Sequence, residues 1–273
     1  MAMAIDSFGL TDKGNVRESN QDNFLIGEIH RSVDIRHSSL SPDALASRFG
    51  SADAHLFVVA DGVGGGPDGE QASEDAITAL LKYVSETVGC FNRLDPSKEH
   101  ELFDRLEETV RGVDQKLREE HAGKRGQAPA TTLTMVLLIW PRAYLIHVGD
   151  SRAYVRRRGR LQQMTRDQTF GEYMVSVGAW TEEQASRARP ASTLSSAIGG
   201  SELQPVVGLV DLEPGDGIVL CTDGLTKHVT NERMAALMEQ PSDAETLGRQ
   251  LVSEALAGGG SDNVAVIVVS THP

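Results

Sequence analysis

The sequence predicts an α+β fold in which antiparallel sheets pack together and amphipathic helices lie outside them. The apolar runs in the middle of the chain are separated only by short turns. Short turns join antiparallel neighbours, since parallel strands need a long crossover. Strands also occur in two blocks, each accompanied by a pair of helical patterns. These observations exclude a doubly wound nucleotide-binding sheet.

The first block opens with a strand over 22–29, and the polar stretch 30–54 that follows is predicted to be a loop or an insertion. A second strand covers 55–61. Two helices follow, because apolar residues recur at three- and four-residue spacing. Their apolar stripes are Ala72, Ala76, Ile77, Leu80, Leu81 and Val84 in the first, and Leu102, Phe103, Leu106, Val110, Val113 and Leu117 in the second.

The second half of the chain is richer in strands. Consecutive strands are predicted over 131–140, 143–149, 152–158 and 161–165, with turns at Pro141–Arg142, Asp150–Ser151 and Gly159. Residues 166–200 are irregular apart from a short helix near 181–188. Further strands cover 204–212 and 217–223, and helices cover 231–239 and 243–257. The second of these helices ends at the glycines 258–260, and a last strand covers 263–270.

Composition narrows the class of protein. The chain has 273 residues, two cysteines and a formal net charge of −13. This surplus of acid argues against a nucleic-acid partner, because neutralising phosphates requires Lys and Arg. The longest apolar stretch, 133–140, is too short to span a bilayer, and the first residues lack the features of a signal peptide. We therefore expect a cytoplasmic protein with reduced thiols and no membrane contact.

Five aspartates stand at the ends of predicted strands. Asp61, Asp150 and Asp223 each follow an apolar run, whereas Asp22 and Asp262 each precede one. Any single one of them could be an ordinary turn or helix-capping residue. Gathered at one rim, however, they would repel one another unless a cation neutralised them. A set of oxygen ligands favours magnesium or manganese over zinc.

The glycines after Asp61 have a compatible explanation. Gly62 adds no bulk beside a carboxylate that binds an ion, and it tolerates unusual backbone angles. The alternative is a phosphate-binding loop. The stretch 62–70 (GVGGGPDGE) lacks the spacing of such loops and is not followed by the required lysine.

Eight short motifs follow one another along the chain: GNVRESNQDNF, VVADGVGG, TTLT, HVGDSRAY, MTRDQT, LSSAIGG, VLCTDGL and GGSDNVAVIVV. This ordered set resembles the metal-dependent serine/threonine protein phosphatases of type 2C (the PPM family), in their compact bacterial form. The resemblance covers about residues 6–270. It implies a single domain over 1–273, folded as a four-layer α-β-β-α sandwich with a flap at about 166–198.

The resemblance also implies a metal centre with two Mn²⁺ or Mg²⁺ ions and, as in bacterial members, a third that is held more weakly. Asp61 matches the aspartate that bridges two ions, and Gly62 matches the residue whose carbonyl contacts one of them through water. Asp223 and Asp262 match the ligands of the other ion. Asp150 matches the ligand of the third ion, which it shares with Asp223.

The implied reaction is hydrolysis of phosphoserine and phosphothreonine in proteins by a metal-bridged hydroxide, opposing a cognate protein kinase. Arg17 matches the arginine that grips the substrate phosphate, because a planar guanidinium pairs with two phosphate oxygens at once. Asp22 matches a carboxylate that supports the ligands or holds water. The implied catalytic set is Arg17, Asp22 and Asp61, in a protein expected to be a monomer.

The chain departs from its relatives at two positions. Val63 stands where some animal members have a histidine, thought to act as the general acid. The proton for the leaving group must then come from a metal-bound water or from another histidine, for which His55, His147 and His228 are the candidates. Ser196 stands where relatives commonly have arginine, so contacts between the flap and the substrate are expected to differ.

Two other functions stay open at this point. A regulator without catalysis would keep the fold and bind phosphoproteins, as the changes at Val63 and Ser196 would allow. A partner-switching phosphatase would act on an anti-sigma antagonist. The intact set of carboxylates favours the general phosphatase over the regulator.

Overall fold

The computed structural model describes residues 3–29, 54–63, 67–87, 99–121, 129–240 and 242–272. Nearly all of the loop expected at 30–54 lies outside these ranges, as does Cys90. Cys221 is a free, buried thiol, as the sequence predicts.

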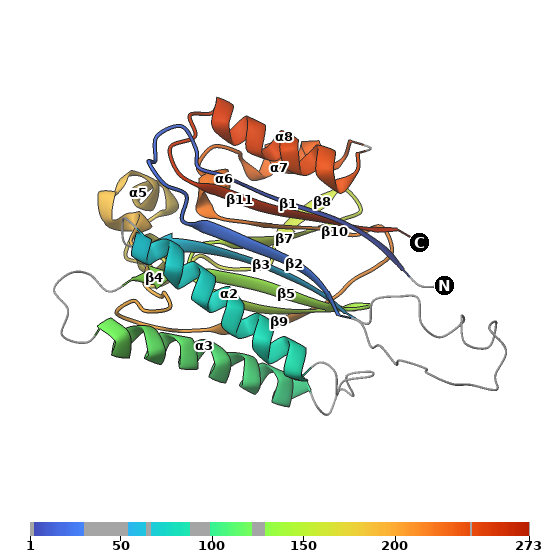
Figure 1. Cartoon of the computed structure of the whole chain (residues 1–273). Coiled ribbons are helices and arrows are strands. Elements are labelled where there is room, and N and C mark those ends of the chain that lie inside the picture. Colours follow the sequence, from blue (N-terminus) through green and yellow to red (C-terminus); the bar gives the residue numbers. More distant parts are fainter. Residues whose placement is uncertain are drawn as a thin grey trace, which may run out of the picture.

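Two antiparallel sheets form the centre of the molecule (Figure 1). One has the strand order β1 (Ala4–Asp12), β11 (Val264–His272), β10 (Gly217–Cys221), β7 (Arg152–Arg157) and β8 (Arg160–Gln163). The other has the order β2 (Asp22–Ile29), β3 (Ala54–Val63), β5 (Leu133–Ile139), β6 (Arg142–Val148) and β9 (Val206–Asp211), and β4 (Ala130–Thr131) pairs with β3.

Helix pairs cover the outer faces of both sheets. Figure 1 shows α2 (Pro67–Thr87) and α3 (Glu99–His121) on one side, and α7 (Asn231–Met238) and α8 (Ala244–Ala257) on the other. The predicted α-β-β-α sandwich is therefore confirmed. Shorter helices lie in the connections: α4 (Phe170–Ser176), α5 (Glu182–Arg187), the 3-10 helix η3 (Arg189–Ser192) and α6 (Asp223–Thr226).

Strand β3 shows why the central strands read as unbroken apolar runs. Leu56 and Val58 pack in the core beneath α2 and α3, whereas Phe57 and Val59 pack in the core between the two sheets. Side chains alternate between the faces of a strand, and here both faces are buried. Each such side chain stabilises the fold by about 1.5–3 kcal/mol. A charge is accepted only where the strand leaves the core.

One predicted connection is wrong. The turn at Asp150–Ser151 does not join antiparallel neighbours, because β6 pairs with β5 and β9 in one sheet while β7 pairs with β10 and β8 in the other. Stacked sheets are only about 10 Å apart, so a few residues suffice to cross between them. Asp150 therefore lies where the chain passes from one sheet to the other.

Other elements differ in detail from the prediction. Strand β1 and helices α4 and α6 were not predicted. Helix α2 begins at Pro67, so its first turn contains Asp68 and Gly69. Leu81 of the predicted α2 stripe is 40% exposed, whereas the predicted stripe of α3 is buried apart from the half-buried Phe103.

Candidate metal centre

The five aspartates at strand ends come to one end of the sandwich. Asp22 and Asp61 face each other in the register between β2 and β3. Asp223 begins α6 directly after β10, and Asp262 precedes β11. A cavity of about 450 Å³ opens there, and its walls include Arg17, Asp61, Gly62, Asp150, Asp223 and Asp262.

Three carboxylates form the tightest group in this cavity. Asp61, Asp150 and Asp223 each offer an oxygen, and these oxygens lie within 4.8 Å of one another. Asp61 comes from one sheet, Asp223 follows a strand of the other, and Asp150 lies on the crossing between them. Sequence-distant carboxylates thus converge as predicted.

Burial and like charge act together on these groups. Burial, followed by the negative charges of Asp22, Asp223 and Asp150, holds the pKa of Asp61 well above its usual range. Burial and the charge of Asp223 raise the pKa of Asp150 to about 8. Burial also raises the pKa of Asp223, against the lowering effect of Lys227. The group therefore favours a bound cation over free carboxylates.

Asp22 lies beneath the cavity rather than on its wall. It is 3% exposed, and its Oδ2 accepts a hydrogen bond of 2.7 Å from the Thr222 hydroxyl. Burial raises its pKa to about 7. Two buried carboxylate oxygens, Oδ1 of Asp22 and Oδ1 of Asp223, have no hydrogen-bond partner among the described residues. Such oxygens are costly unless a donor or a cation satisfies them.

Short contacts fix the backbone of β3 at Asp61. The Asp61 carbonyl accepts hydrogen bonds from the Thr131 hydroxyl (3.0 Å) and from the Thr132 amide (2.9 Å). The Asp61 amide donates to the Thr132 hydroxyl at 3.0 Å. The motif TTLT thereby has a structural role, because its first two threonines hold the backbone of the residue that carries the carboxylate.

Gly62 is required by close packing. Its amide donates to the Gln21 carbonyl at 3.1 Å, and a Cβ at this position would lie 2.3 Å from the Gly69 carbonyl oxygen. No other residue type fits between the end of β3 and the first turn of α2 without a backbone shift.

Arg17 lies at the rim of the cavity and pairs with Asp262. Its Nε is 2.7 Å from Oδ1 and its Nη2 is 2.8 Å from Oδ2, so the guanidinium makes a two-pronged contact. Partial burial acts to raise the pKa of Asp262, but hydrogen bonds from Arg17 and Lys227 outweigh it and lower that pKa. Asn263 anchors the loop around Arg17 by donating to the carbonyls of Lys13 and Ser19.

Lys227 also lines the cavity and was not predicted. Its Nζ lies 2.6 Å from Oδ2 of Asp223 and 2.7 Å from Oδ2 of Asp262. These neighbouring carboxylates raise the pKa of Lys227 despite its partial burial, which acts to lower it. The signal available in the sequence was its position four residues after Asp223, which places both side chains on one face of a helical turn.

The histidines considered as proton donors do not line the cavity. His147 is buried, contacts the Thr134 hydroxyl and the Arg166 carbonyl, and has a pKa lowered to about 4 by burial. His228 contacts the Ser261 hydroxyl and amide. His55 lies near the start of β3, six residues from Asp61. The cavity walls, as far as the described ranges reach, contain no histidine.

The predicted flap contributes one wall. Residues 192–197 line the cavity, and η3 and α4 pack beside them through the contact of Gly171 with Ala191. Ser196 is 2% exposed, and its hydroxyl accepts a hydrogen bond from the Gln204 amide at 2.9 Å. Its hydroxyl is therefore already hydrogen-bonded within the cavity wall.

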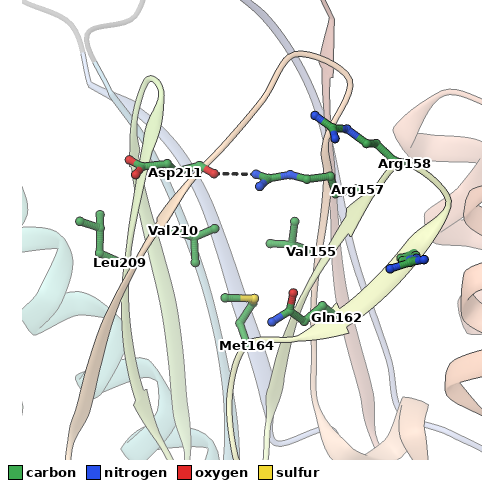
Figure 2. Close-up of a pocket in the computed structure, with 9 residues that line it drawn as sticks. Val155, Arg157, Arg158, Gln162, Met164, Leu209, Val210 and Asp211 are labelled. Carbon is green, nitrogen blue, oxygen red and sulfur yellow. Dashed lines mark hydrogen bonds between the residues drawn. The ribbon is translucent and has the colours of Figure 1, made fainter.

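A larger cavity, of about 790 Å³, lies between strands β7 and β8 of one sheet and β9 of the other. Figure 2 shows Arg157 reaching across it to the Asp211 carbonyl, above Val155, Met164 and Val210. The aspartates of the metal centre are not among its lining residues. Size alone does not identify the chemical site in this molecule.

The donor set of the smaller cavity fits a hard divalent ion. The candidate ligands are carboxylate oxygens, Oδ1 of Asp223 has no hydrogen-bond partner among the described residues, and no cysteine or histidine lies in the described wall. Such sets suit Mg²⁺ or Mn²⁺ better than Zn²⁺. The residues present therefore fit the metal that the resemblance implies.

Comparisons with known proteins agree on one family. The family model described as protein phosphatase 2C matches residues 32–258. Over 218 residues the chain is 34% identical to the serine/threonine protein phosphatase PstP of Mycobacterium tuberculosis. This alignment covers 80% of this chain but only 40% of PstP. Over 265 residues it is 28% identical to the protein phosphatase PhpP of Streptococcus pneumoniae, covering 96% of each.

A solved structure shares the fold. It is the catalytic domain of PstP in complex with two manganese ions, matched at a TM-score of 0.75 and 28% identity over 100% of both chains. Among the described residues, no helix combines the length and apolar character needed to cross a membrane.

Proposed function

This chain belongs to the protein phosphatase 2C family, and from this membership we propose that it is a metal-dependent protein serine/threonine phosphatase. It hydrolyses phosphoserine and phosphothreonine in proteins and opposes a cognate protein kinase. The observation that carries the proposal is the convergence of Asp61, Asp150 and Asp223 within 4.8 Å of one another, in the cavity that Arg17 also lines.

The metal ligands in this proposal are Asp61, the Gly62 carbonyl, Asp150, Asp223 and Asp262. The manganese ions in the PstP structure support Mn²⁺, with Mg²⁺ as the other candidate. When bound, such ions supply positive charge for the phosphoryl group and lower the pKa of a water molecule that attacks it.

The chain's own residues bind and orient the phosphate. The planar guanidinium of Arg17 is matched to two phosphate oxygens, and Asp262 holds it in position at the rim. The buried carboxylate of Asp22, fixed by Thr222, adds negative charge behind Asp61 and so strengthens cation binding there. Flap residues 192–197 contact the peptide on either side of the phosphorylated residue.

The leaving serine or threonine oxygen needs a proton. Val63, which lines the cavity in place of histidine, cannot supply it, and His55, His147 and His228 lie elsewhere. In this proposal water in the cavity is the donor.

The wider setting is part of the same proposal. The protein is a single domain over 1–273 and acts as a monomer in the cytoplasm. The core shared by the two sheets supports one domain, and the free thiol of Cys221 suits a reducing compartment.

The test uses purified protein stripped of metal with EDTA. Turnover of a phosphothreonine peptide should be absent after stripping and return with Mn²⁺. Asp61→Asn and Asp223→Asn should each lower kcat/KM by at least about a thousandfold, since they remove charge at the reacting phosphoryl group. Asp75→Asn, which alters an aspartate paired with Lys116 on the helical face, is the matched control. Full activity in Asp61→Asn and Asp223→Asn would overturn the proposal.

A further inference from the structure

We propose that Lys227 is a built-in cation of the metal centre, which competes with a divalent ion for the carboxylates of Asp223 and Asp262. The inference deepens the proposed function by assigning what governs metal loading of that site. It rests on the contacts of the Lys227 ammonium, which nothing in the family resemblance anticipates.

The local backbone places this ammonium between the two carboxylates. Asp223 begins α6, and the Lys227 amide donates to the Asp223 carbonyl at 2.9 Å, so the two residues are one helical turn apart. The Lys227 side chain is 37% exposed and reaches Oδ2 of Asp223 at 2.6 Å and Oδ2 of Asp262 at 2.7 Å. A divalent ion shared by these oxygens would need the volume that the ammonium fills.

The carboxylates are unequally satisfied. Asp262 accepts contacts on both oxygens: Oδ1 from Arg17 and from the Asn263 amide, and Oδ2 from Arg17 and Lys227. Oδ1 of Asp223, by contrast, has no partner among the described residues.

This difference predicts an order of loading. An ion held at Asp61 and the Gly62 carbonyl, as the family resemblance implies for one of the two ions, leaves the ammonium in place. An ion that needs Asp262 must displace Lys227. The second ion should therefore bind more weakly than the first, and Lys227 should account for a measurable part of that difference beside Arg17, which contacts both oxygens of Asp262. A hydrogen bond to a charged group contributes more free energy than one between neutral groups. Displacing the two contacts of the Lys227 ammonium should therefore weaken binding of the second ion by at least about tenfold.

The first experiment measures Mn²⁺ binding in the absence of substrate. Isothermal titration calorimetry gives the two affinities, and the electron paramagnetic resonance signal of free Mn²⁺ counts the bound ions. Lys227→Met removes the ammonium but keeps the length of the side chain. We expect it to bind the second Mn²⁺ at least about tenfold more tightly and the first within about threefold of the unaltered protein. Lys116→Met is the matched control, because Lys116 also pairs with an aspartate, Asp75 at 3.3 Å, away from the centre.

Superimposable isotherms for Lys227→Met and the unaltered protein would overturn the proposal. An equal gain in Lys116→Met would overturn it too, since the effect would then be one of net charge.

A second experiment uses the unaltered protein, so it still tests the proposal if Lys227→Met fails to fold. Acylation of lysines, read by mass spectrometry during Mn²⁺ titration, should show Lys227 protected until the second ion binds and then more reactive, while Lys116 stays constant. Unchanged reactivity of Lys227 at saturation would refute the inference. Neither readout requires turnover. A chain that showed both effects but cleaved no phosphopeptide would refute the proposed function and leave this inference standing.

Discussion

The hydrogen bond between Thr222 and Asp22 joins the two sheets, and its removal gives a quantitative test of the structure. Thr222 is fully buried at the end of β10. Its hydroxyl donates to Oδ2 of Asp22 at 2.7 Å and accepts from the Ala265 amide at 2.8 Å. Thr222→Val keeps the shape of the side chain and removes both contacts.

The expected cost follows from what each partner loses. A buried amide without its acceptor costs about 1–3 kcal/mol, and a carboxylate without its donor costs about the same or more. The methyl group gained by valine offsets about 0.8 kcal/mol. We therefore expect the free energy of unfolding to fall by about 3 kcal/mol, a large fraction of the roughly 5–15 kcal/mol of a typical domain.

Urea unfolding in EDTA at pH 8 is the suitable assay, because Asp22, with its pKa raised to about 7 by burial, is then ionised. At pH 6 the loss should be smaller, since a protonated Asp22 needs the Thr222 hydroxyl less. Thr222→Ser keeps the hydroxyl and should lose only about 1 kcal/mol of packing. The reasoning is refuted if Thr222→Val lowers the free energy of unfolding by less than about 1 kcal/mol, or if Thr222→Ser lowers it by as much as Thr222→Val.

Three further predictions concern charge, packing and pH. Burial and the charge of Asp223 raise the pKa of Asp150 to about 8, so its ionisation destabilises the metal-free fold as pH rises from about 4 to 8. Asp150→Asn should therefore raise the melting temperature in EDTA at pH 8 and reduce the increase in melting temperature on adding Mn²⁺. A lower melting temperature in EDTA would contradict this. A Cβ on Gly62 would lie 2.3 Å from the Gly69 carbonyl oxygen, whereas one on Gly27 meets nothing nearer than 3.5 Å. Gly62→Ala should therefore lower the Mn²⁺ affinity measured by calorimetry, and Gly27→Ala should not. Equal affinities in the two variants would contradict this. Burial lowers the pKa of His147 from 6.5 to about 4. The stability that the buried, neutral imidazole contributes is therefore complete above about pH 6.5, and the free energy of unfolding falls by about 3 kcal/mol as pH drops through 4. A His147 imidazole that titrates near pH 6.5 by NMR would contradict this.

The strands and the position of the carboxylates could be predicted because burial leaves a local record. A strand buried on both faces, such as β3, reads as an unbroken apolar run, and this run stops where the first charged residue, Asp61, stands. Asp61 and Asp223 therefore mark the ends of apolar runs, and the packing of the two sheets brings those ends to one rim. The convergence of both with Asp150 follows from this pattern and from the motifs together.

The features that were missed depend on residues far apart in the sequence. Strand β1 is half-exposed, and it pairs with β11 at the other end of the chain, so its own pattern gives little signal. The length of the link at Asp150 does not reveal whether the chain stays in its sheet or crosses to the other. Lys227 was visible as a neighbour of Asp223 one turn away, but its contact with Asp262 appears only in three dimensions.

The crossing at Asp150 has a mechanical consequence. The proposed ligands Asp61 on one side and Asp223 and Asp262 on the other belong to layers that are held together largely by apolar side chains. Any shear of one layer past the other would pull the ligands apart before it exposed the core. Metal content should therefore report the alignment of the layers, and a trimmed side chain between them, as in Val59→Ala, should loosen the ions at temperatures where the chain is still folded.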